Sequence, residues 1–259
     1  MRMSGLLITL FALLLARSVL AQEPVTPAPV APTAAAADQA MAGAPIDARD
    51  LEAWLDGFMP YALQRGHIPG AVVVVVSGKG PILAKGYGYA DRAARKPVDP
   101  ETTLFRPGSV SKLLTWTAVM QQVEAGKLDL DRDVNAYLDF RIPPYEGKPI
   151  TLRNILTHTS GFEESIRYLI TSDPKALLPL DTLMKKALPV QVAAPGSTPA
   201  YSNYATGLAG YIVQRVSGIP LEAYLEERIF RPIGMTRSTF RQPLPPELEP
   251  LMSNGYVFG

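Results

Sequence analysis

Cysteine is absent from the 259-residue chain, and histidine occurs only twice. The lack of cysteine excludes disulfides, thiolate catalysis and a lipid-modified leader cysteine. Two histidines without cysteine argue against a zinc site, because zinc is usually held by several Cys or His ligands. An excess of one charge is also missing, since 25 basic and 24 acidic residues leave a net charge of +1. With no basic stripe, we do not expect nucleic acid as a partner.

Long apolar runs are missing except at the N-terminus. Arg2 precedes an apolar segment at residues 6–16, and the small-residue site Val19-Leu20-Ala21 follows. This order is typical of a secretory signal peptide, and the apolar segment is too short to span a bilayer. We therefore expect cleavage after Ala21 to remove residues 1–21. The mature protein would be exported, periplasmic or extracellular, with no stable membrane span; a retained anchor is the alternative.

The rest of the chain divides into a tether and one domain. Residues 22–46 are rich in proline and alanine and lack apolar periodicity, which predicts an extended linker. The folded domain is expected over residues 47–259. Asp47 is placed to cap a helix that ends near Gly66, and within it apolar residues such as Leu55 and Phe58 recur at the spacing of a buried helix face. The β-branched run 71–76 predicts a buried strand.

After this first helix, the predicted strands come before the other helices of the domain. A turn at 77–81 and an apolar segment at 82–90 predict a hairpin. Apolar spacing predicts one helix from Ser109 to Gly126 and a mostly helical block over residues 151–235. We therefore expect an α+β, three-layer fold in which helices pack on an antiparallel sheet, rather than a doubly wound sheet.

Acidic residues at positions 129, 131 and 133 are the one segment with the composition of a metal site. The segment lacks the glycine and the terminal glutamate of a calcium loop. We therefore predict a solvated turn that leads into a short helix. His67, just after the first helix, is interpreted as a residue of the helix C-terminus. Neither a metal nor a cofactor is expected.

The segment from Ser109 to Lys112 is the first candidate for chemistry. A serine hydroxyl is a weak nucleophile until a base takes its proton. Residues three apart on a helix share a face, so Lys112 is spaced to reach Ser109. The same spacing recurs at Ser172 and Lys175, where Ser172 is expected to cap a short helix with Pro174 in its first turn. Spacing alone therefore does not identify a nucleophile.

The segment Tyr201-Ser202-Asn203 is the second candidate, and it follows a loop-forming stretch at 195–199. A tyrosine beside an ammonium group can have a lowered pKa and can move protons. An asparagine amide can donate and accept hydrogen bonds at once. The alternative is a core tyrosine and an Asx turn, since these residue types are common in loops.

Five segments form an ordered pattern: GYGYAD at 86–91, FRPGSVSK at 105–112, LTHTSGF at 156–162, PGSTPAYSN at 195–203 and PIGM at 232–235. In this order they resemble the serine β-lactamase-like family, which includes class C β-lactamases, D-alanyl-D-alanine carboxypeptidases and related esterases. The resemblance covers roughly residues 50–240 and is far more specific than the serine–lysine spacing. It implies a β-lactamase/transpeptidase-like fold.

The resemblance implies a role for each matching residue. Ser109 would be the nucleophile at the N-terminus of a buried helix, and its backbone N–H would supply half of an oxyanion hole. Lys112 would take the serine proton or hold the charge that lets Tyr201 do so, and Tyr201 would relay a proton to the leaving group. Asn203 would orient Lys112 and the substrate amide. The segment containing His158 would close a turn near the site without acting in catalysis.

One motif of the family, Lys-Thr-Gly or His-x-Gly on a C-terminal strand, does not occur in the 259 residues. In the family this strand contributes contacts to the substrate carboxylate and the second oxyanion donor. We therefore expect an incomplete domain that lacks its closing strands and has an unpaired sheet edge. Its tail, residues 237–259, is expected to be loop-like.

Two functions of different class remain open. The first is a serine hydrolase that forms an acyl-enzyme with an amide, lactam or ester; its substrate would be a small-molecule or peptidoglycan-type acyl compound. Within this class, an esterase or peptidase is favoured over a dedicated β-lactamase. The second is a catalytically inactive binding protein or a truncated remnant, because losing one oxyanion donor costs about 10²–10³ in rate.

Overall fold

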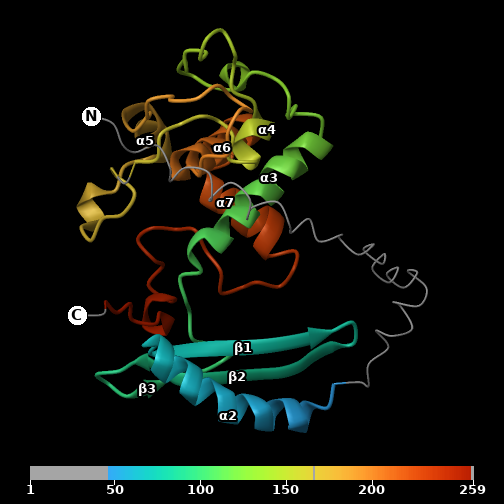
Figure 1. Ribbon diagram of the computed structural model, residues 1–259, viewed down its shortest axis with the longest axis vertical. Coiled ribbons are helices and arrows are strands. Elements are labelled where there is room, and N and C mark those ends of the chain that lie inside the picture. Colours follow the sequence, from blue (N-terminus) through green and yellow to red (C-terminus); the bar gives the residue numbers. More distant parts are fainter. Residues whose placement is uncertain (1–45, 166, 258–259) are drawn as a thin grey trace, which may run out of the picture. The chain divides into compact units, whose positions relative to one another are not determined.

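The computed structural model describes residues 46–165 and 167–257 (Figure 1). The chain divides after Leu51 into two units, and the unit Glu52–Gly259 contains the sheet, the helical core and the candidate site. The predicted signal peptide and all but the last residue of the predicted linker lie outside the described residues. Among the described helices, none is long and apolar enough to cross a membrane.

The first described helix is α2 (Ala48–Gly66), and it begins where the sequence predicts. The Oδ1 atom of Asp47 accepts hydrogen bonds from two backbone N–H groups of the first turn, which is the role of an N-cap. The helix buries Leu55 and Leu63. Phe58, which the spacing assigns to the core, is instead 45% exposed and stacks on the exposed ring of Trp54.

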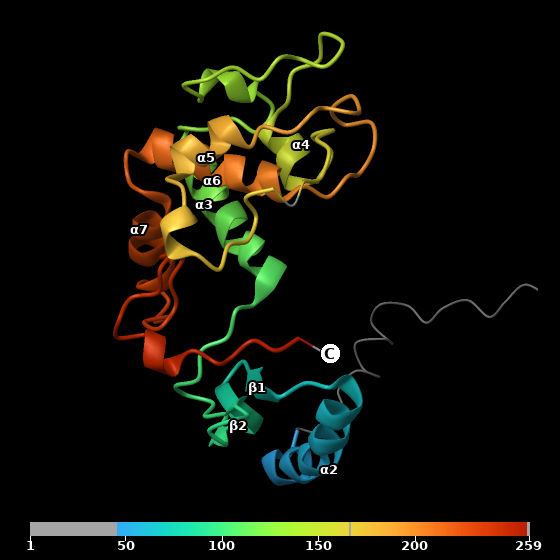
Figure 2. The ribbon, with the colours of Figure 1, turned by 90° about the vertical axis from the view of Figure 1, so that its left-hand side faces the viewer.

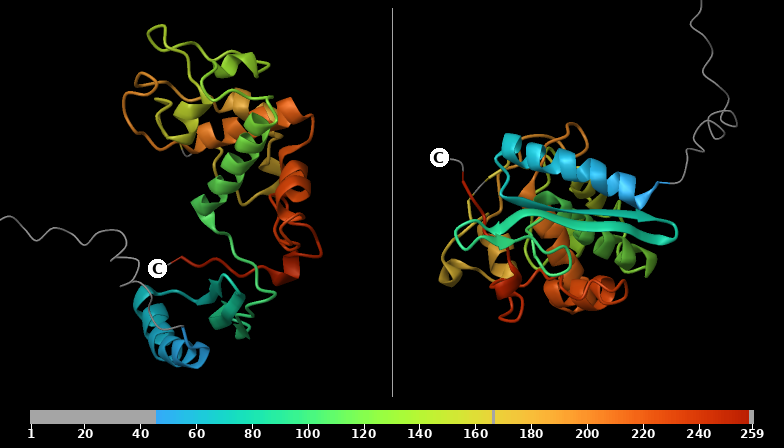
Figure 3. Two further views of the ribbon diagram at one scale, coloured as in Figure 1. Left: turned by 90° about the vertical axis from the view of Figure 1, so that its right-hand side faces the viewer. Right: turned by 90° about the horizontal axis from the view of Figure 1, so that it is seen from below.

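The predicted hairpin is formed by β1 (Gly70–Ser77) and β2 (Gly80–Asp91), which pair antiparallel. The short strand β3 (Lys96–Pro97) adds to β2, so the order in the sheet is β1-β2-β3. Figure 3 shows α2 running along the hairpin. The Nζ atom of Lys85 on β2 fixes this arrangement, because it donates to Glu52 at 2.6 Å and to Asp56 at 2.9 Å.

The prediction that residues 71–76 form a fully buried strand is wrong. Val74 and Val76 are 52% and 64% exposed, whereas Val73 and Val75 are half-buried. This alternation follows from the strand's period of two, with only one face covered. Within the described residues, β1 pairs with β2 alone.

The helical core is centred on two helices, α3 (Lys112–Glu124) and α6 (Asn203–Ser217), which pack against each other (Figures 1 and 2). As the spacing predicts, α6 buries Leu208 and Ile212 completely. The start of α3 differs from the prediction of a buried helix, because Leu113 in its first turn is 63% exposed and Val110, just before the helix, is 71% exposed. The helix enters the core only from its second turn onward.

The predicted helical block at 151–235 contains, besides α6, only short helices: α4 (Leu152–Leu156), η3 (Pro174–Ala176), α5 (Leu180–Lys186), α7 (Leu221–Leu225) and the π-helical turn η4 (Glu226–Phe230). The short helix predicted after the acidic segment is η2 (Val134–Ala136), and η5 (Glu249–Leu251) lies in the tail. The tail after Met235 is mostly loop, as predicted. It nevertheless contacts the sheet region, because Met252 bridges to Leu104 and the N–H of Asn254 donates to the carbonyl of Ala90.

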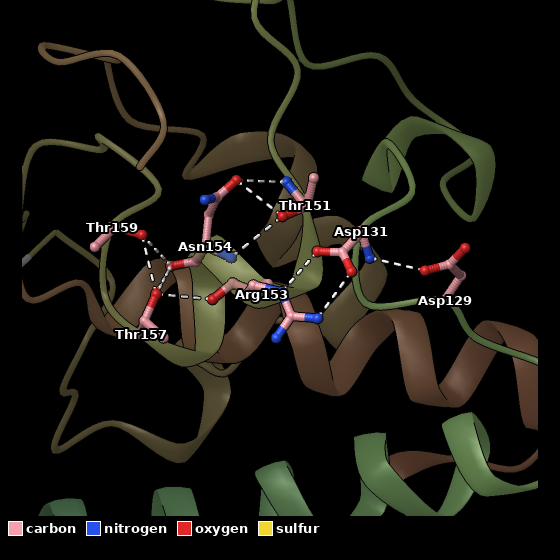
Figure 4. A network of polar contacts seen from close by, with 7 residues as sticks. All are labelled: Asp129, Asp131, Thr151, Arg153, Asn154, Thr157 and Thr159. Carbon is pink, nitrogen blue, oxygen red and sulfur yellow. Dashed lines mark hydrogen bonds and ion pairs between the residues drawn. The ribbon is translucent and has the colours of Figure 1, made fainter. Parts of the chain in front are cut away.

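The acidic segment is a turn held by an arginine (Figure 4). The carboxylate of Asp131 accepts two hydrogen bonds from the Arg153 guanidinium, at 2.6 and 2.8 Å. Asp129 accepts from the backbone N–H of Asp131, and a capping box between Thr151 and Asn154 fixes the start of α4. Across the part of the chain that the structure describes, no group of three acidic, histidine or cysteine residues is placed to hold a metal ion.

Candidate active site

Ser109 lies in η1 (Gly108–Ser111), a 3-10 turn that runs directly into α3. The α-helix therefore begins at Lys112 rather than at Ser109, which corrects the predicted boundary. The Nζ atom of Lys112 donates a hydrogen bond to the Oγ atom of Ser109 over 3.1 Å. The three-residue spacing thus produces the predicted contact even though its first residues have 3-10 geometry, because i and i+3 side chains eclipse in such a turn.

Tyr201 and Asn203 lie on either side of the N-cap of α6. The cap is Ser202, which is fully buried and whose side chain accepts a hydrogen bond from the first turn. The hydroxyl of Tyr201 donates to the Oγ atom of Ser109 over 2.6 Å, and the Oδ1 atom of Asn203 accepts from Lys112 over 2.7 Å. Tyr201 is 46% exposed, so it is not a core residue. The fold brings all four predicted site residues into one hydrogen-bonded cluster.

The charge of Lys112 sets the electrostatics of this cluster. Its Nζ atom lies 4.7 Å from the ring centroid of Tyr201. The Lys112 ammonium, assisted by the hydrogen bond to Ser109, holds the pKa of Tyr201 below its ordinary value of 10. A nearby cation favours the phenolate because it stabilises the charged form of the acid. Tyr201 is therefore easier to ionise than a free tyrosine.

His158 packs against Tyr201 and holds the chain on both sides of it. The ring centroids of His158 and Tyr201 are 4.5 Å apart, and the rings of His158 and Trp116 form an edge-to-face pair with centroids 6.1 Å apart. Its Nδ1 atom accepts from the N–H of Ser202 over 3.4 Å, and its backbone carbonyl accepts from the N–H of Ala200 over 2.6 Å. These contacts fit a residue that positions Tyr201, whereas the sequence predicted only that the segment containing His158 closes a turn near the site.

The stability of the protein is expected to fall on mild acidification because of His158. Burial, with a smaller contribution from Lys112, holds the pKa of His158 below its ordinary value of 6.5. The folded state thus favours the neutral imidazole. The resulting contribution to the free energy of unfolding is fully present above the pKa that His158 has in the unfolded chain, and it is lost as the pH falls through the lower pKa of the folded state. Chemical denaturation between about pH 5 and 8 should show a decrease below pH 6.5 that is weaker in His158→Gln. An equal slope in the two proteins would contradict this assignment.

The turn after His158 ties the segment that carries Tyr201 to the core. Gly161 has a φ of 79°, and a Cβ atom there would overlap the carbonyl oxygen of Ala193. The carbonyl of Gly161 accepts from the N–H of Val192, and the carbonyl of Thr159 accepts from the N–H of Gly196, each over 2.8 Å. Only glycine allows this approach of two backbones at a positive φ.

Glu164 is a member of the site that the sequence analysis did not identify. Its Oε2 atom accepts from the backbone N–H of Asn203, and its Oε1 atom accepts from the side-chain Nδ2, each over 2.8 Å. The two residues are 39 positions apart, and no local pattern links them. The only available signal was the place of Glu164 directly after the segment 156–162, which itself lies near the site.

The second serine–lysine pair lacks the surroundings of the first. Asp173, rather than the predicted Ser172, caps the short helix η3, because its side chain accepts from the N–H of Lys175 over 2.9 Å. Pro174 occupies the first turn, as expected. Lys175 is exposed. The structure thus places this lysine at an exposed surface turn, whereas Lys112 lies in the hydrogen-bonded cluster with Ser109 and Asn203.

Comparison with known proteins places the chain among related sequences and structures. The family described as Beta-lactamase matches residues 38–253. PbpX of Bacillus subtilis (strain 168), whose name describes a penicillin-binding protein, is 36% identical over 187 residues, which are 72% of this chain and 44% of PbpX. The octameric penicillin-binding protein homologue from Pyrococcus abyssi superposes with a TM-score of 0.65 and 30% identity, over 79% of this chain and 48% of that one. A class C beta lactamase superposes with a TM-score of 0.66 and 29% identity, over 83% of this chain and 57% of that one.

These superpositions confirm the predicted α+β fold of the β-lactamase and transpeptidase type. The chain spans less than half the length of PbpX, at 44%, and about half the length of the homologue from Pyrococcus abyssi, at 48%. The part that is shared includes the candidate nucleophile and its three polar neighbours, since the family match extends over residues 38–253.

Proposed function

This chain belongs to the beta-lactamase family, and on that basis we propose that Ser109 is the nucleophile of a serine hydrolase. The reaction is acyl-enzyme formation with an amide, lactam or ester, followed by hydrolysis. The observation that supports this proposal is the position of the Ser109 Oγ atom, which accepts hydrogen bonds from both Lys112 and Tyr201. Two groups able to exchange protons with one hydroxyl are what a weak serine nucleophile requires.

The first step transfers the proton of Ser109. A neutral Tyr201 donates to Ser109, but an ionised Tyr201 accepts the serine proton along the same contact. The ammonium of Lys112 makes this ionisation easier, because it lies beside the phenol. In the alternative assignment, a neutral Lys112 is the base and takes the proton directly. In either case the Oγ atom attacks the carbonyl carbon, and a tetrahedral intermediate with an oxyanion forms.

The second step breaks the bond to the leaving group. Tyr201 or Lys112 passes the abstracted proton to the departing nitrogen or oxygen, which leaves an ester between the acyl group and Ser109. Water then attacks this ester with the same groups as proton acceptors, which releases the acid and restores the hydroxyl. Asn203 holds Lys112 through its Oδ1 atom, and one of the two Nδ2 hydrogens is still available for a substrate carbonyl.

Covalent labelling tests the proposal. Incubation with a fluorophosphonate or a fluorescent penicillin should give a protein adduct, and peptide mapping should locate it on Ser109. The variant Ser109→Ala should give no adduct, since no oxygen remains at that position. The variant Ser172→Ala is the matched control, because it removes the serine of the second serine–lysine pair and should label like the unchanged protein.

The labelling experiment also separates the two functional classes. Folded protein that gives no Ser109 adduct with either probe would contradict the hydrolase and support a catalytically inactive binding protein or remnant. The relative rates of labelling by the two probes also indicate the substrate class. Within the hydrolases, we propose an esterase or peptidase rather than a dedicated β-lactamase. We also propose that residues 1–21 direct export to the periplasm or the exterior and that residues 22–46 form a linker.

A further inference from the structure

We propose that Glu164 is a positioning residue that fixes the orientation of the Asn203 amide and thereby holds Lys112 against Ser109. This inference rests on the proposed function, because it concerns how the serine becomes reactive. It assigns a role to a residue that lies outside the serine, lysine, tyrosine and asparagine motifs. The contact that carries it is the pair of hydrogen bonds from Asn203 to the two carboxylate oxygens of Glu164.

The two neighbours of Asn203 determine which way its amide points. An ionised carboxylate only accepts hydrogen bonds, and an ammonium only donates them. The Nδ2 group must therefore face Glu164, and the Oδ1 atom must face Lys112, as the distances of 2.8 and 2.7 Å show. A reversed amide would place its oxygen against the carboxylate and its N–H groups against the ammonium. Both contacts would then be repulsive.

The backbone contact prevents the carboxylate from moving away. Asn203 is the first residue of α6, and its N–H is one of the groups that a helix N-terminus leaves without an intrahelical partner. Glu164 accepts from this N–H, and the N-cap Ser202 accepts from the N–H of Ala205 in the same first turn, so two acceptors share the free donors. Negative charge is also favourable at this end of a helix dipole. Glu164 is thus held by one helix and in turn holds the side chain that begins it.

Three contacts join four residues in a continuous row in which charged and dipolar groups alternate. The carboxylate of Glu164 contacts the amide of Asn203, the amide contacts the ammonium of Lys112, and the ammonium contacts the hydroxyl of Ser109. Lys112 is a long side chain that loses rotamer freedom when it is held in one geometry. A fixed acceptor at Asn203 keeps the Nζ atom near Ser109, whereas an amide that can rotate holds it there for only part of the time.

A double-mutant cycle tests whether Glu164 acts through Asn203. The readout is the second-order rate of Ser109 labelling by a fluorophosphonate, measured for Glu164→Ala, Asn203→Ala and the double variant. We expect Glu164→Ala to slow labelling by roughly 10-fold to 100-fold, because a misplaced catalytic group costs rate steeply. In the Asn203→Ala background the same substitution should change the rate little, because the coupling is already lost. Additive effects in the double variant would overturn the proposal.

Neighbouring and conservative substitutions supply the controls. Glu163→Gln removes the same charge one residue earlier and should label at the unchanged rate. Glu164→Gln keeps the size of the side chain, but its amide N–H₂ group cannot accept from the second donor of Asn203, so it should behave like Glu164→Ala. If Glu164→Gln instead labels like the unchanged protein, the paired carboxylate is not needed and the proposal fails.

A spectroscopic measurement keeps the inference testable if the protein does not label at all. The side-chain amide of Asn203 is observable by ¹H–¹⁵N NMR, with Asn203→Ala giving its assignment. A hydrogen bond to a carboxylate should separate its two proton resonances and slow their exchange with water. Glu164→Ala should remove this signature and Glu163→Gln should keep it. An unchanged Asn203 signal in Glu164→Ala would overturn the positioning role, whereas missing labelling alone would only reject the hydrolase.

Discussion

Lys112→Met is expected to slow the acylation of Ser109 by about 10²–10⁴-fold, the usual contribution of a positioned acid–base group. Methionine keeps most of the length and apolar stem of lysine but has no charge and no N–H donor. The substitution removes the hydrogen bond to Ser109 and the largest influence that lowers the pKa of Tyr201. The pKa of Tyr201 should therefore rise towards its ordinary value of 10, and fewer molecules will hold an ionised phenol near neutral pH.

Two measurements check this result. The rate of fluorophosphonate labelling gives the kinetic effect, and ultraviolet titration compared with Tyr201→Phe gives the ionisation of that tyrosine. Lys175→Met is the matched control, because it alters the lysine of the second serine–lysine pair at an exposed turn. It should leave both quantities unchanged. A Lys112→Met protein that labels at the original rate would remove Lys112 from the proposed mechanism.

Gly161→Ala is expected to destabilise the protein by about 2–6 kcal/mol, a large share of the roughly 5–15 kcal/mol that holds a typical domain together. Two costs combine at this position. A side chain at a φ of 79° is strained by roughly 1–3 kcal/mol. The new methyl group also overlaps the carbonyl of Ala193, and forced overpacking of this kind costs about 1–3 kcal/mol more. Urea denaturation followed by circular dichroism measures the loss.

Two other glycines separate these costs. Gly147 has a φ of 78° but no atom within 4 Å of an added Cβ, so Gly147→Ala should show only the strain. Gly57 lies inside α2 with open space around it and no positive φ, so Gly57→Ala should be neutral or stabilising by about 0.5–1 kcal/mol. If Gly161→Ala costs no more than Gly147→Ala, the close approach of the 161 and 193 backbones does not constrain the fold.

The loss of Gly161 should also affect the site, since the same turn holds the chain that carries Tyr201. Val192 and Gly196 donate to the turn on one side, and Ala200 donates to the carbonyl of His158 on the other. This arrangement explains why the segment 156–162, which contributes no reacting group, belongs to the ordered pattern of five segments. It supports Tyr201 by fixing backbone atoms, and His158 adds a ring contact of 4.5 Å between centroids.

Local sequence patterns predicted those parts of the fold that depend on neighbouring residues. Asp47 caps α2, the turn near residue 78 reverses the hairpin, and the spacing of Leu208 and Ile212 selects the buried face of α6. Patterns of this kind arise from interactions within one or two turns of the chain. The same patterns wrongly predicted that Phe58 and Val76 are buried. Both side chains are exposed, because no element covers them among the described residues.

The sequence by itself determined the residue types of the candidate site and the pairing of Ser109 with Lys112, because a spacing of three fixes two side chains on one face. The resemblance of the sequence to a known family placed Tyr201 and Asn203 in the same site, but only the tertiary structure decided which of their atoms contact Ser109 and Lys112, since these contacts join positions 92 and 91 residues apart. It alone identified Glu164, and it alone showed why Lys175 differs from Lys112. Contacts between distant segments depend on how α3 and α6 pack, and helix packing is set by the whole core rather than by any local pattern.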